Sequence, residues 1–569
     1  MLERDSPAHS EISRERWLFA ERAARSISEI QGNISNVTDI IVFLEVLGYD
    51  DVSVATYGFA DLTDFARYIF DFLDFVSAPA QSDQMAAAGS KKKARRSSAR
   101  FLEGLALAFP MVAMLAVLFI FGVSLWMARV LPIEITTAFL SGVFLGILIS
   151  EGPAQAFNRL FSFYYSQNNL GEVKRAIRRN DYFVGTALLV AAAVLIAISI
   201  FGGLPIALVS ITIFSAVTIA TNRASYLVIF ALKKLGQMVA AYTIALAALV
   251  IIYLYAPSDE IAKLTSFVPI GLINEVSTEA GFQLIVRYFL ALIVAFAILS
   301  IPALYYRSKI MTSKSTSSEK APAFYSPFSV GDKTVKSRLG VQLWETLPYF
   351  IFGTFFFLMI FADRIISWIF NPFVADYGTL PLEFNAAYHT GADPALIILL
   401  GVTITSYVIL APIYDELGES SAKMTMAKAE SLVGILQRAY DKLLIAATLT
   451  STSLALLVNY EGVEIMHYLR GALVSLQILR VASIGDVFIS IFFVNAMFLI
   501  LVNRVKVAAT ISVICVVIVV FVGTFLGFAG FQYIIWAYLL SSFVAMISST
   551  AYCIKIRRNL SNLFLGRYV

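Results

Sequence analysis

Twelve long apolar stretches fill the chain after residue 100, and they constrain its fold more than any other feature. A transmembrane helix needs about 20 mainly apolar residues to cross roughly 30 Å of hydrocarbon. Hydrophobic residues make up 59% of the chain and charged residues only 14%, with a mean hydropathy of +0.78, unlike a soluble domain. The stretches lie near residues 104–128, 134–157, 182–201, 204–230, 237–255, 282–305, 343–370, 394–413, 442–459, 484–503, 507–526 and 531–554. The sequence therefore predicts an all-α polytopic membrane protein with about twelve transmembrane helices.

The Lys and Arg residues between these stretches predict the direction in which the chain crosses the membrane. Cytoplasmic loops carry an excess of basic residues. With residues 1–100 inside, the predicted inner segments hold most of the basic residues, including the cluster from Lys91 to Arg96 and seven residues between 306 and 340. The predicted outer segments hold only Arg129, Lys263, Arg470 and Arg480. Twelve helices with both termini in the cytoplasm fit this asymmetry, and the net charge of +4 calls for no nucleic-acid partner.

The polar first hundred residues are predicted to form a cytosolic unit ahead of the membrane helices. Apolar residues recur at helical spacing within residues 1–85, which predicts a small helical domain. Its aromatic stripe fits a core or an interaction face better than a ligand site, and consists of Phe65, Tyr68, Ile69, Phe72 and Phe75. Residues 86–100 are basic and are predicted to form a flexible linker that contacts anionic lipid.

The order of polar and apolar segments predicts two lobes of six helices each. A polar loop at 306–340 divides the apolar stretches into residues 101–305 and residues 341–569. Each half has a long inner segment after its second helix, Phe161 to Asp181 in the first and Tyr414 to Asp441 in the second. Two similar lobes are the usual plan of a transporter that alternates access around a site between them. The alternative stays open, because any twelve-helix chain can be divided in two and the halves share little primary similarity.

Ionisable residues inside membrane helices are costly, so they are candidates for a substrate path or an ion-coupling site. These candidates are Glu151, Arg159, Arg223, Arg287, Glu345, Asp363, Arg364 and Asp486. For Arg287, Arg364 and Asp486 the alternative is a charged group that extends to the membrane interface. Arg223 interrupts a long apolar run, which favours a polar cavity or a kink. Asp363 and Arg364 are adjacent, so each is expected to find its partner on another helix or at the outer rim rather than in the other.

Several short motifs, in this order along the chain, resemble one transporter family. They are Gly152-Pro153-Ala154-Gln155 followed by Arg159, then Asp363-Arg364-Ile365-Ile366-Ser367-Trp368, then Asp393-Pro394, and then Arg480 with Gly485. The sequence resembles the inner-membrane Pel exopolysaccharide transporter family, within the superfamily of multidrug extruders and lipid-linked oligosaccharide and polysaccharide flippases. The resemblance covers roughly residues 100–569 and adds Gln155 and Trp368 to the candidates.

This resemblance implies a substrate, partners and a location. It implies that the chain moves a polysaccharide or lipid-linked glycan across the inner membrane, through a cavity between two six-helix lobes. It also implies a cytosolic glycosyltransferase and other membrane subunits of an exopolysaccharide export complex as partners, with the N-terminal unit as a docking element.

The two cysteines, Cys515 and Cys553, both lie in apolar stretches, so neither a metal nor a cofactor is expected.

Two other classes of function stay open at this point. A proton- or sodium-coupled drug antiporter of the same superfamily would need a compact apolar site with one buried acid. A membrane glycosyltransferase would need acidic metal-binding or acceptor motifs in a loop, and no loop holds an Asp-X-Asp pair. We therefore expect a transporter rather than an enzyme.

Overall fold

The computed structural model describes residues 19–20, 23, 37–46, 49–76, 83–128, 131–166, 169–256, 279–313, 339–372, 382–421 and 426–560. Within these ranges the chain is helical apart from short links, turns and one isolated bridge between Val123 and Ala128. Twelve helices of the described ranges are long and apolar enough to cross a membrane. The predictions of an all-α fold with twelve membrane helices are therefore confirmed, and the chain is a multi-pass membrane protein.

The first lobe supplies the first six of these helices, all of them continuous. They are α5 (Asp83–Phe121), α6 (Ile133–Ser166), α7 (Leu170–Gly202), α8 (Ile206–Ala231), α9 (Leu235–Tyr255) and α11 (Glu279–Thr312). Helix α6 lies at the centre of the lobe and packs against α7 and α8. Small residues permit this contact, since a Cβ atom on Gly146 would lie 2.7 Å from the Ala216 carbonyl oxygen of α8.

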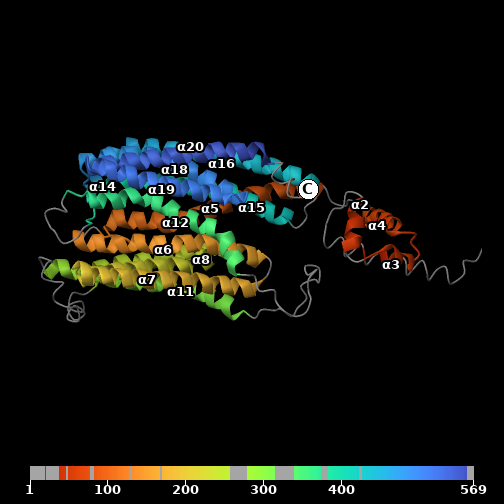
Figure 1. The fold of residues 1–569 in the computed structure, drawn as a ribbon, viewed down its shortest axis with the longest axis horizontal. Helices are drawn as coiled ribbons and strands as arrows, with labels where there is room; N and C mark the ends of the chain where they lie inside the picture. The colour runs from red at the N-terminus through yellow and green to blue at the C-terminus, as the bar shows by residue number, and fades with distance from the viewer. Residues whose placement is uncertain are drawn as a thin grey trace, which may run out of the picture. The chain divides into compact units, whose positions relative to one another are not determined.

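The second lobe supplies the other six, and its second span is composite. Its helices are α12 (Leu339–Ile369), α14 (Ala386–Ala392), the short turn η3 (Pro394–Leu396), α15 (Ile397–Ser421), α16 (Met426–Tyr460), α17 (Gly462–Leu469), α18 (Leu473–Leu501), α19 (Val505–Gly527), the turn η4 (Phe531–Tyr533) and α20 (Ile534–Arg558). Helices α14, η3 and α15 together make one span, Ala386–Ile413. In Figure 1, α6, α7, α8 and α11 group together, α18, α19 and α20 group together, and α12 lies between the groups. Helix α12 packs against α6 of the first lobe as well as α19 and α20 of its own.

The N-terminal unit is helical where the structure describes it. Helices α2 (Val37–Val46), α3 (Asp51–Ala55) and α4 (Leu62–Val76) enclose a small core that includes Phe65 and Ile69 of the predicted stripe. Asp50 caps α3 by accepting the Ser53 backbone N–H at 2.8 Å, and this hydrogen bond lowers the pKa of the Asp50 carboxyl. The cytosolic location of this unit stays a prediction.

Two segments differ from what the sequence predicts. The expected linker at 86–100 belongs to the continuous helix α5, because Ala, Lys and Arg, which make up most of this segment, are strong helix formers even in a polar stretch. The expected loop at 306–340 is helical at both ends, since α11 continues to Thr312 and α12 begins at Leu339, while residues 314–338 lie outside the described residues. Helices in both lobes are therefore longer than the apolar stretches alone indicate.

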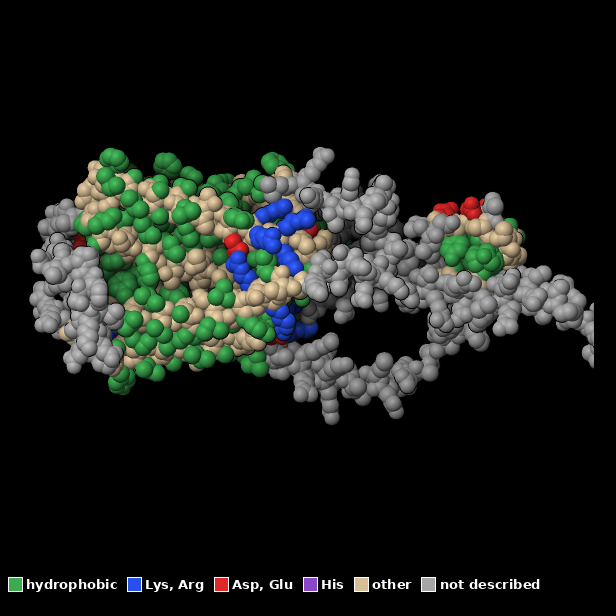
Figure 2. Space-filling model, turned by 90° about the horizontal axis from the view of Figure 1, so that it is seen from below, with side chains coloured by type: hydrophobic (Ala, Val, Ile, Leu, Met, Phe, Trp, Pro, Cys, Tyr) green, Lys and Arg blue, Asp and Glu red, His purple; other side chains and the backbone are tan. Residues whose placement is uncertain are grey.

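The predicted charge asymmetry appears as a band on the surface. Figure 2 shows Lys and Arg side chains gathered near one end of the membrane helices, beside a largely hydrophobic surface. Within this end of the first lobe, Arg307 of α11 pairs with Asp181 of α7. The orientation with this end in the cytoplasm stays a prediction that follows from the positive-inside rule.

Candidate functional site

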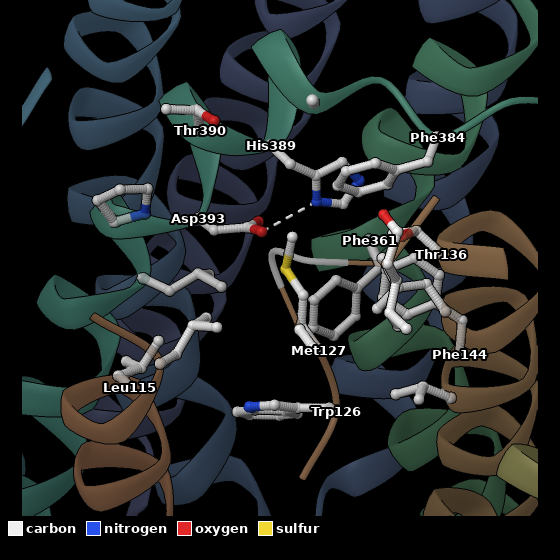
Figure 3. Close-up of a pocket in the computed structure, with 18 of the residues that line it drawn as sticks. Leu115, Trp126, Met127, Thr136, Phe144, Phe361, Phe384, His389, Thr390 and Asp393 are labelled. Carbon is white, nitrogen blue, oxygen red and sulfur yellow. Dashed lines mark hydrogen bonds and ion pairs between the residues drawn. The ribbon is translucent and has the colours of Figure 1, made fainter. Parts of the chain in front are cut away.

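A cavity of about 390 Å³ lies between the two lobes, and we call it the lobe cavity. The first lobe contributes α5, α6 and their connection, and the second lobe contributes α12, α14 and the segment before α14. Its walls are mostly apolar and aromatic, with Trp126, Phe144, Phe361 and Phe384 among the lining residues. Figure 3 shows His389 and Asp393 on one side of this space and Trp126 on the other, with the Met127 side chain drawn between them. The cavity lies in the half of the bundle that the charge pattern predicts to face outward.

A compact turn between α5 and α6 positions Trp126. Gly122 ends α5 with a φ of +75°, a backbone conformation that glycine adopts readily. The Ser124 hydroxyl then accepts the backbone N–H groups of Trp126 and Met127 at 3.3 and 3.2 Å. The buried Tyr288 hydroxyl of α11 donates to the Ser124 carbonyl at 2.9 Å. These bonds fix the indole on the first-lobe wall of the lobe cavity.

The segment before α14 positions Phe384 and contacts both lobes. The Phe384 backbone N–H donates to the Thr137 hydroxyl of α6 at 2.8 Å, and the Asn371 side chain donates to the Phe384 carbonyl at 3.2 Å. Asn385 caps α14 by accepting the Tyr388 N–H at 3.0 Å.

Next to Phe384, Glu383 is only 5% exposed and its Oε2 atom has no hydrogen-bond partner among the described residues. Burial raises the pKa of the Glu383 carboxyl, and the nearby Glu134 carboxylate raises it further.

His389 and Asp393 form the polar wall of the lobe cavity. They are four residues apart, so their side chains lie on one helical face, and Nδ1 of His389 lies 2.9 Å from Oδ2 of Asp393. Trp368 of α12 donates its Nε1–H to Nε2 of His389 at 2.9 Å. An indole nitrogen only donates, so Nε2 must be the acceptor and the imidazole proton must reside on Nδ1, where it is donated to Asp393. This geometry assigns a neutral imidazole to His389. His389 was not among the candidate residues predicted from the sequence.

Arg364 of α12 connects this wall to the buried interior of the second lobe. The Arg364 side chain is 1% exposed, and its Nε atom lies 2.8 Å from Oδ1 of Asp393. Its Nη1 atom donates to the Ile360 carbonyl at 2.7 Å and lies 3.1 Å from Oδ1 of Asp363. The expectation that Arg364 would find a partner on another helix is confirmed by Asp393. The expectation that adjacent Asp363 and Arg364 would not pair is wrong, because the long guanidinium folds back along its own helix. The alternative of an arginine that extends to the interface is also excluded by this burial.

Two tyrosines complete this arrangement, which we call the second-lobe network: Asp363, Arg364, Trp368, Tyr388, His389, Asp393, Asp486 and Tyr538. The Tyr388 hydroxyl donates to Oδ2 of the fully buried Asp363 at 2.7 Å. The Tyr538 hydroxyl of α20 donates to Oδ1 of Asp486 on α18. Oδ2 of Asp486 is buried and has no hydrogen-bond partner among the described residues. Two carboxyl groups, those of Asp363 and Asp393, thus contact Arg364, and the third, that of Asp486, is bound by Tyr538.

The first lobe contains a simpler charge arrangement. Glu151 of α6 forms an ion pair with Arg223 of α8, whose guanidinium carbon lies 5.5 Å from the ring centre of Phe357 on α12. The Glu151 side chain is 5% exposed and the Arg223 side chain 36%. The interruption of the apolar run by Arg223 is thus explained by a partner, and two candidates from the sequence lie together.

The two lobes meet most closely where α6 crosses α12. A Cβ atom on Gly353 would lie 2.8 Å from the Glu151 carbonyl oxygen and 2.7 Å from Cγ of Gln155, and a side chain on Gly152 would collide with Thr354.

Nearer the basic end, the Arg159 guanidinium lies 5.8 Å from the ring centre of Tyr349. We call the next contact the latch: Arg179 donates to the Gln342 side-chain oxygen, and Gln342 donates to the Tyr164 hydroxyl at 2.5 Å. The lobes are therefore in contact at the basic end, on the opposite side of the crossing from the lobe cavity.

Two sequence candidates do not join these groups. Arg287 lies on α11, where its buried Nε atom has no hydrogen-bond partner in the described part of the chain, and Glu345 is exposed near the start of α12. The sequence reasoning missed Tyr388, His389 and Tyr538, and it noted Asp393 only as part of a motif. The four-residue spacing of His389 and Asp393 before an apolar run was the available signal.

Comparisons with known proteins support the fold. No family model matches the chain, and no curated protein matches it. Among solved structures, a MATE transporter in the straight conformation matches with a TM-score of 0.55 and 11% identity, over 82% of this chain and 96% of that one. An outward-facing multidrug resistance MATE transporter of the MOP superfamily matches with a TM-score of 0.53 and 10% identity, over 81% and 96%. A MOP-superfamily transporter from Pyrococcus furiosus, described as having a binding pocket of reverse polarity, matches with a TM-score of 0.51 and 11% identity, over 81% and 96%.

These matches have a clear scope. The chain has a fold similar to that of these MOP-superfamily structures. This likeness agrees with the predicted all-α fold of twelve membrane helices. The narrower resemblance to the Pel family gains no support from these comparisons and rests on the short motifs alone.

Proposed function

We propose that the chain moves a lipid-linked glycan or a polysaccharide across the inner membrane, with its two lobes alternating access to the lobe cavity. The observation that carries the proposal is the pairing of an aromatic cavity at one end of the lobe interface with a hydrogen-bonded latch at the other. Such an interface can open at only one end at a time if the lobes pivot about the close α6–α12 crossing. Alternating access requires this geometry.

The walls of the lobe cavity suit sugars. Aromatic faces such as Trp126 and Phe384 can stack on the apolar face of a sugar ring, while Asp393 and Thr136 can bind its hydroxyl groups. A volume of about 390 Å³ lies within the usual range for small-ligand sites. The cavity therefore accommodates a few sugar units of a polymer, or the head sugars of a lipid-linked glycan, rather than the whole molecule.

The second-lobe network is the proposed site of ion coupling. Its carboxyl groups outnumber its arginine, and His389 is neutral, so the network has room for a bound proton or cation. Asp486 is the proposed proton carrier because one of its carboxyl oxygens has no hydrogen-bond partner within the described part of the chain. Because Arg364 joins Asp393 on the cavity wall to the interior of the network, a change of charge inside would reach the substrate site.

A second candidate function is a proton- or sodium-coupled antiporter for a hydrophobic organic cation. The observation in its favour is that Asp393 is the one carboxylate among the residues lining the lobe cavity, on a wall that is otherwise mostly apolar. For this function Asp393 would bind the cation directly.

Transport by the purified full-length protein in proteoliposomes separates the two functions. A fluorescent lipid-linked oligosaccharide and a fluorescent organic cation would be assayed in parallel, with and without a pH gradient. For glycan transport, Trp126→Ala should reduce oligosaccharide movement at least tenfold, while Glu464→Gln, at an exposed position of α17, should have no effect. Movement of the cation alone, abolished by Asp393→Asn, would overturn the glycan proposal. Co-purification of a glycosyltransferase from native membranes would test the proposed partners.

A further inference from the structure

A second hollow lies on the outer surface of the second lobe, between α12 and α19, and we call it the α12–α19 groove. Its volume is about 400 Å³, and it is separate from the lobe cavity. The lining residues are Trp344, Leu347, Pro348, Ile351, Lys506, Ala509, Thr510, Val513 and Ile514. None of the groups discussed above lines it, so the proposed function does not use it.

The sequence builds this groove from one stripe on each helix. On α12 the lining positions are i, i+3, i+4 and i+7, and on α19 they follow the same spacing, so each helix presents one face. The small side chains of Ala509 and Thr510 leave space between the helices where larger residues would fill it. The groove extends over about two helical turns, or about 10 Å along the helix axes. Its walls are apolar except at the end where both helices begin.

The polar end of the groove has three features that suit a phospholipid head group. Lys506 and Trp344 are exposed, and the Lys506 ammonium lies 5.9 Å from the centre of the indole ring. Tryptophan and lysine are typical of the membrane interface. Pro348 has no N–H, so the Trp344 carbonyl oxygen lacks the donor it would have in a regular helix. The groove therefore offers a cation and a carbonyl acceptor above an apolar channel.

The neighbouring charges favour an anion at this end. Arg504 immediately precedes α19, and the acid nearest in sequence to Trp344 is Glu345, which lies near Tyr349, a residue outside the groove. This end of α12 and α19 is also the end that the charge pattern predicts to be cytoplasmic, where the leaflet carries anionic lipid. The adjacent helix α20 ends in Lys555, Arg557 and Arg558, of which Arg557 is bound to Asp441.

We propose that the α12–α19 groove binds an anionic glycerophospholipid, with phosphatidylglycerol as the representative. The phosphodiester lies at Lys506, a head-group hydroxyl donates to the Trp344 carbonyl, and one acyl chain lies along Leu347, Ile351 and Ile514. Zwitterionic phosphatidylcholine carries a bulky quaternary ammonium with no hydrogen-bond donor, so it would meet the Lys506 charge unfavourably and leave the Trp344 carbonyl unused.

Native mass spectrometry of the full-length protein in mild detergent tests this proposal. The protein would be titrated with phosphatidylglycerol or phosphatidylcholine, and the lipid-bound fraction measured. We expect preferential retention of phosphatidylglycerol and about fivefold weaker retention by Lys506→Gln, as one basic residue near an anionic surface contributes about 1 kcal/mol. Lys234→Gln, at the start of α9 in the first lobe, is the matched control and should leave retention unchanged.

A second variant tests the apolar part of the groove independently of charge. Thr510→Leu should fill the channel on an exposed face of α19 and reduce phosphatidylglycerol retention while leaving Lys506 in place. Equal retention of the two lipids by the unaltered protein would overturn the proposal, and so would equal losses in the Lys506 and Lys234 variants. Unchanged retention in both Lys506→Gln and Thr510→Leu would also overturn it. The transport assay above does not depend on these outcomes, so the two proposals fail separately.

Discussion

The two lobes bury charged groups in different ways. The first lobe contains a balanced ion pair, whereas the second-lobe network contains more carboxyl groups than cations and so could bind a proton. In the first lobe, one glutamate meets one arginine, Glu151 and Arg223, and the pair is balanced. In the second lobe, Arg364 is shared by Asp363 and Asp393, while one carboxyl oxygen of nearby Asp486 has no hydrogen-bond partner in the ranges that the structure describes. A balanced pair gains little from taking up a proton, whereas an excess of carboxyl groups leaves a place for one. This difference is the reason for proposing ion coupling in the second lobe and a role in helix association for the pair in the first.

The largest expected effect comes from removing the shared arginine. Arg364→Met should lower the free energy of unfolding by about 3–5 kcal/mol, because it leaves the fully buried Asp363 without its cation. Thermal unfolding of the detergent-purified protein, followed by size-exclusion fluorescence, measures this loss. The exposed Arg480→Met should unfold like the unaltered protein. A stable Arg364→Met protein would mean that the second-lobe network tolerates excess negative charge. The two lobes would then not differ in the stability cost of losing an arginine.

Breaking the first-lobe pair should cost less. The Arg223 side chain is 36% exposed, so the charge left behind by Glu151→Gln is less enclosed by protein than that of Asp363, and we expect a loss of about 1–2 kcal/mol. A double-mutant cycle with Arg223→Met measures the coupling, and the double variant should recover part of the loss. Transport by the double variant should keep its pH dependence. If that pH dependence disappeared, coupling would belong to the first lobe instead.

Asp486→Asn should change transport rather than stability. The amide oxygen can still accept the Tyr538 hydroxyl, so we expect the free energy of unfolding to change by less than about 1 kcal/mol. The asparagine side chain does not titrate, so transport in proteoliposomes should become independent of the pH gradient. Glu464→Gln serves as the control for loss of a carboxylate. A normal response to the gradient in Asp486→Asn would show that Asp486 does not carry the proton.

Glu383, at the edge of the lobe cavity, should give the smallest effect and a characteristic pH dependence. Its raised pKa means that the folded protein favours the protonated form. Its contribution to stability is therefore fully present below the pKa of an unfolded glutamate and is lost as the pH rises through the folded pKa. Glu383→Gln should thus be slightly more stable than the unaltered protein at neutral pH and equal to it in acid. Thermal unfolding across pH 4 to 8 checks this, and a lower stability of the variant at pH 7 would contradict it.

The twelve spans could be predicted from the sequence because hydropathy is a local property of each segment. The pairing of charges could not, because it depends on which helix faces meet. Glu151 and Arg223 were separately identified as candidates, but nothing in the sequence indicates that α6 lies against α8. The flexibility of the arginine side chain explains the error at Asp363 and Arg364. Tyr388 and Tyr538 were missed because a tyrosine in an apolar helix carries no sign of the acid that it contacts.

The close contact at Gly152 and Gly353 gives the molecule a mechanical property. If the two helices rotate about this contact, the two ends of α6 move in opposite directions, and the contact lies at unequal distances from the two ends. Thr136, on the wall of the lobe cavity, lies 16 residues from Gly152, or about 24 Å, and Tyr164 of the latch lies 12 residues away, or about 18 Å. A separation of about 3 Å at the latch would therefore bring the cavity walls about 4 Å closer together. A methyl group at either glycine would shift the contact point between α6 and α12 and would change the displacement at both the lobe cavity and the latch.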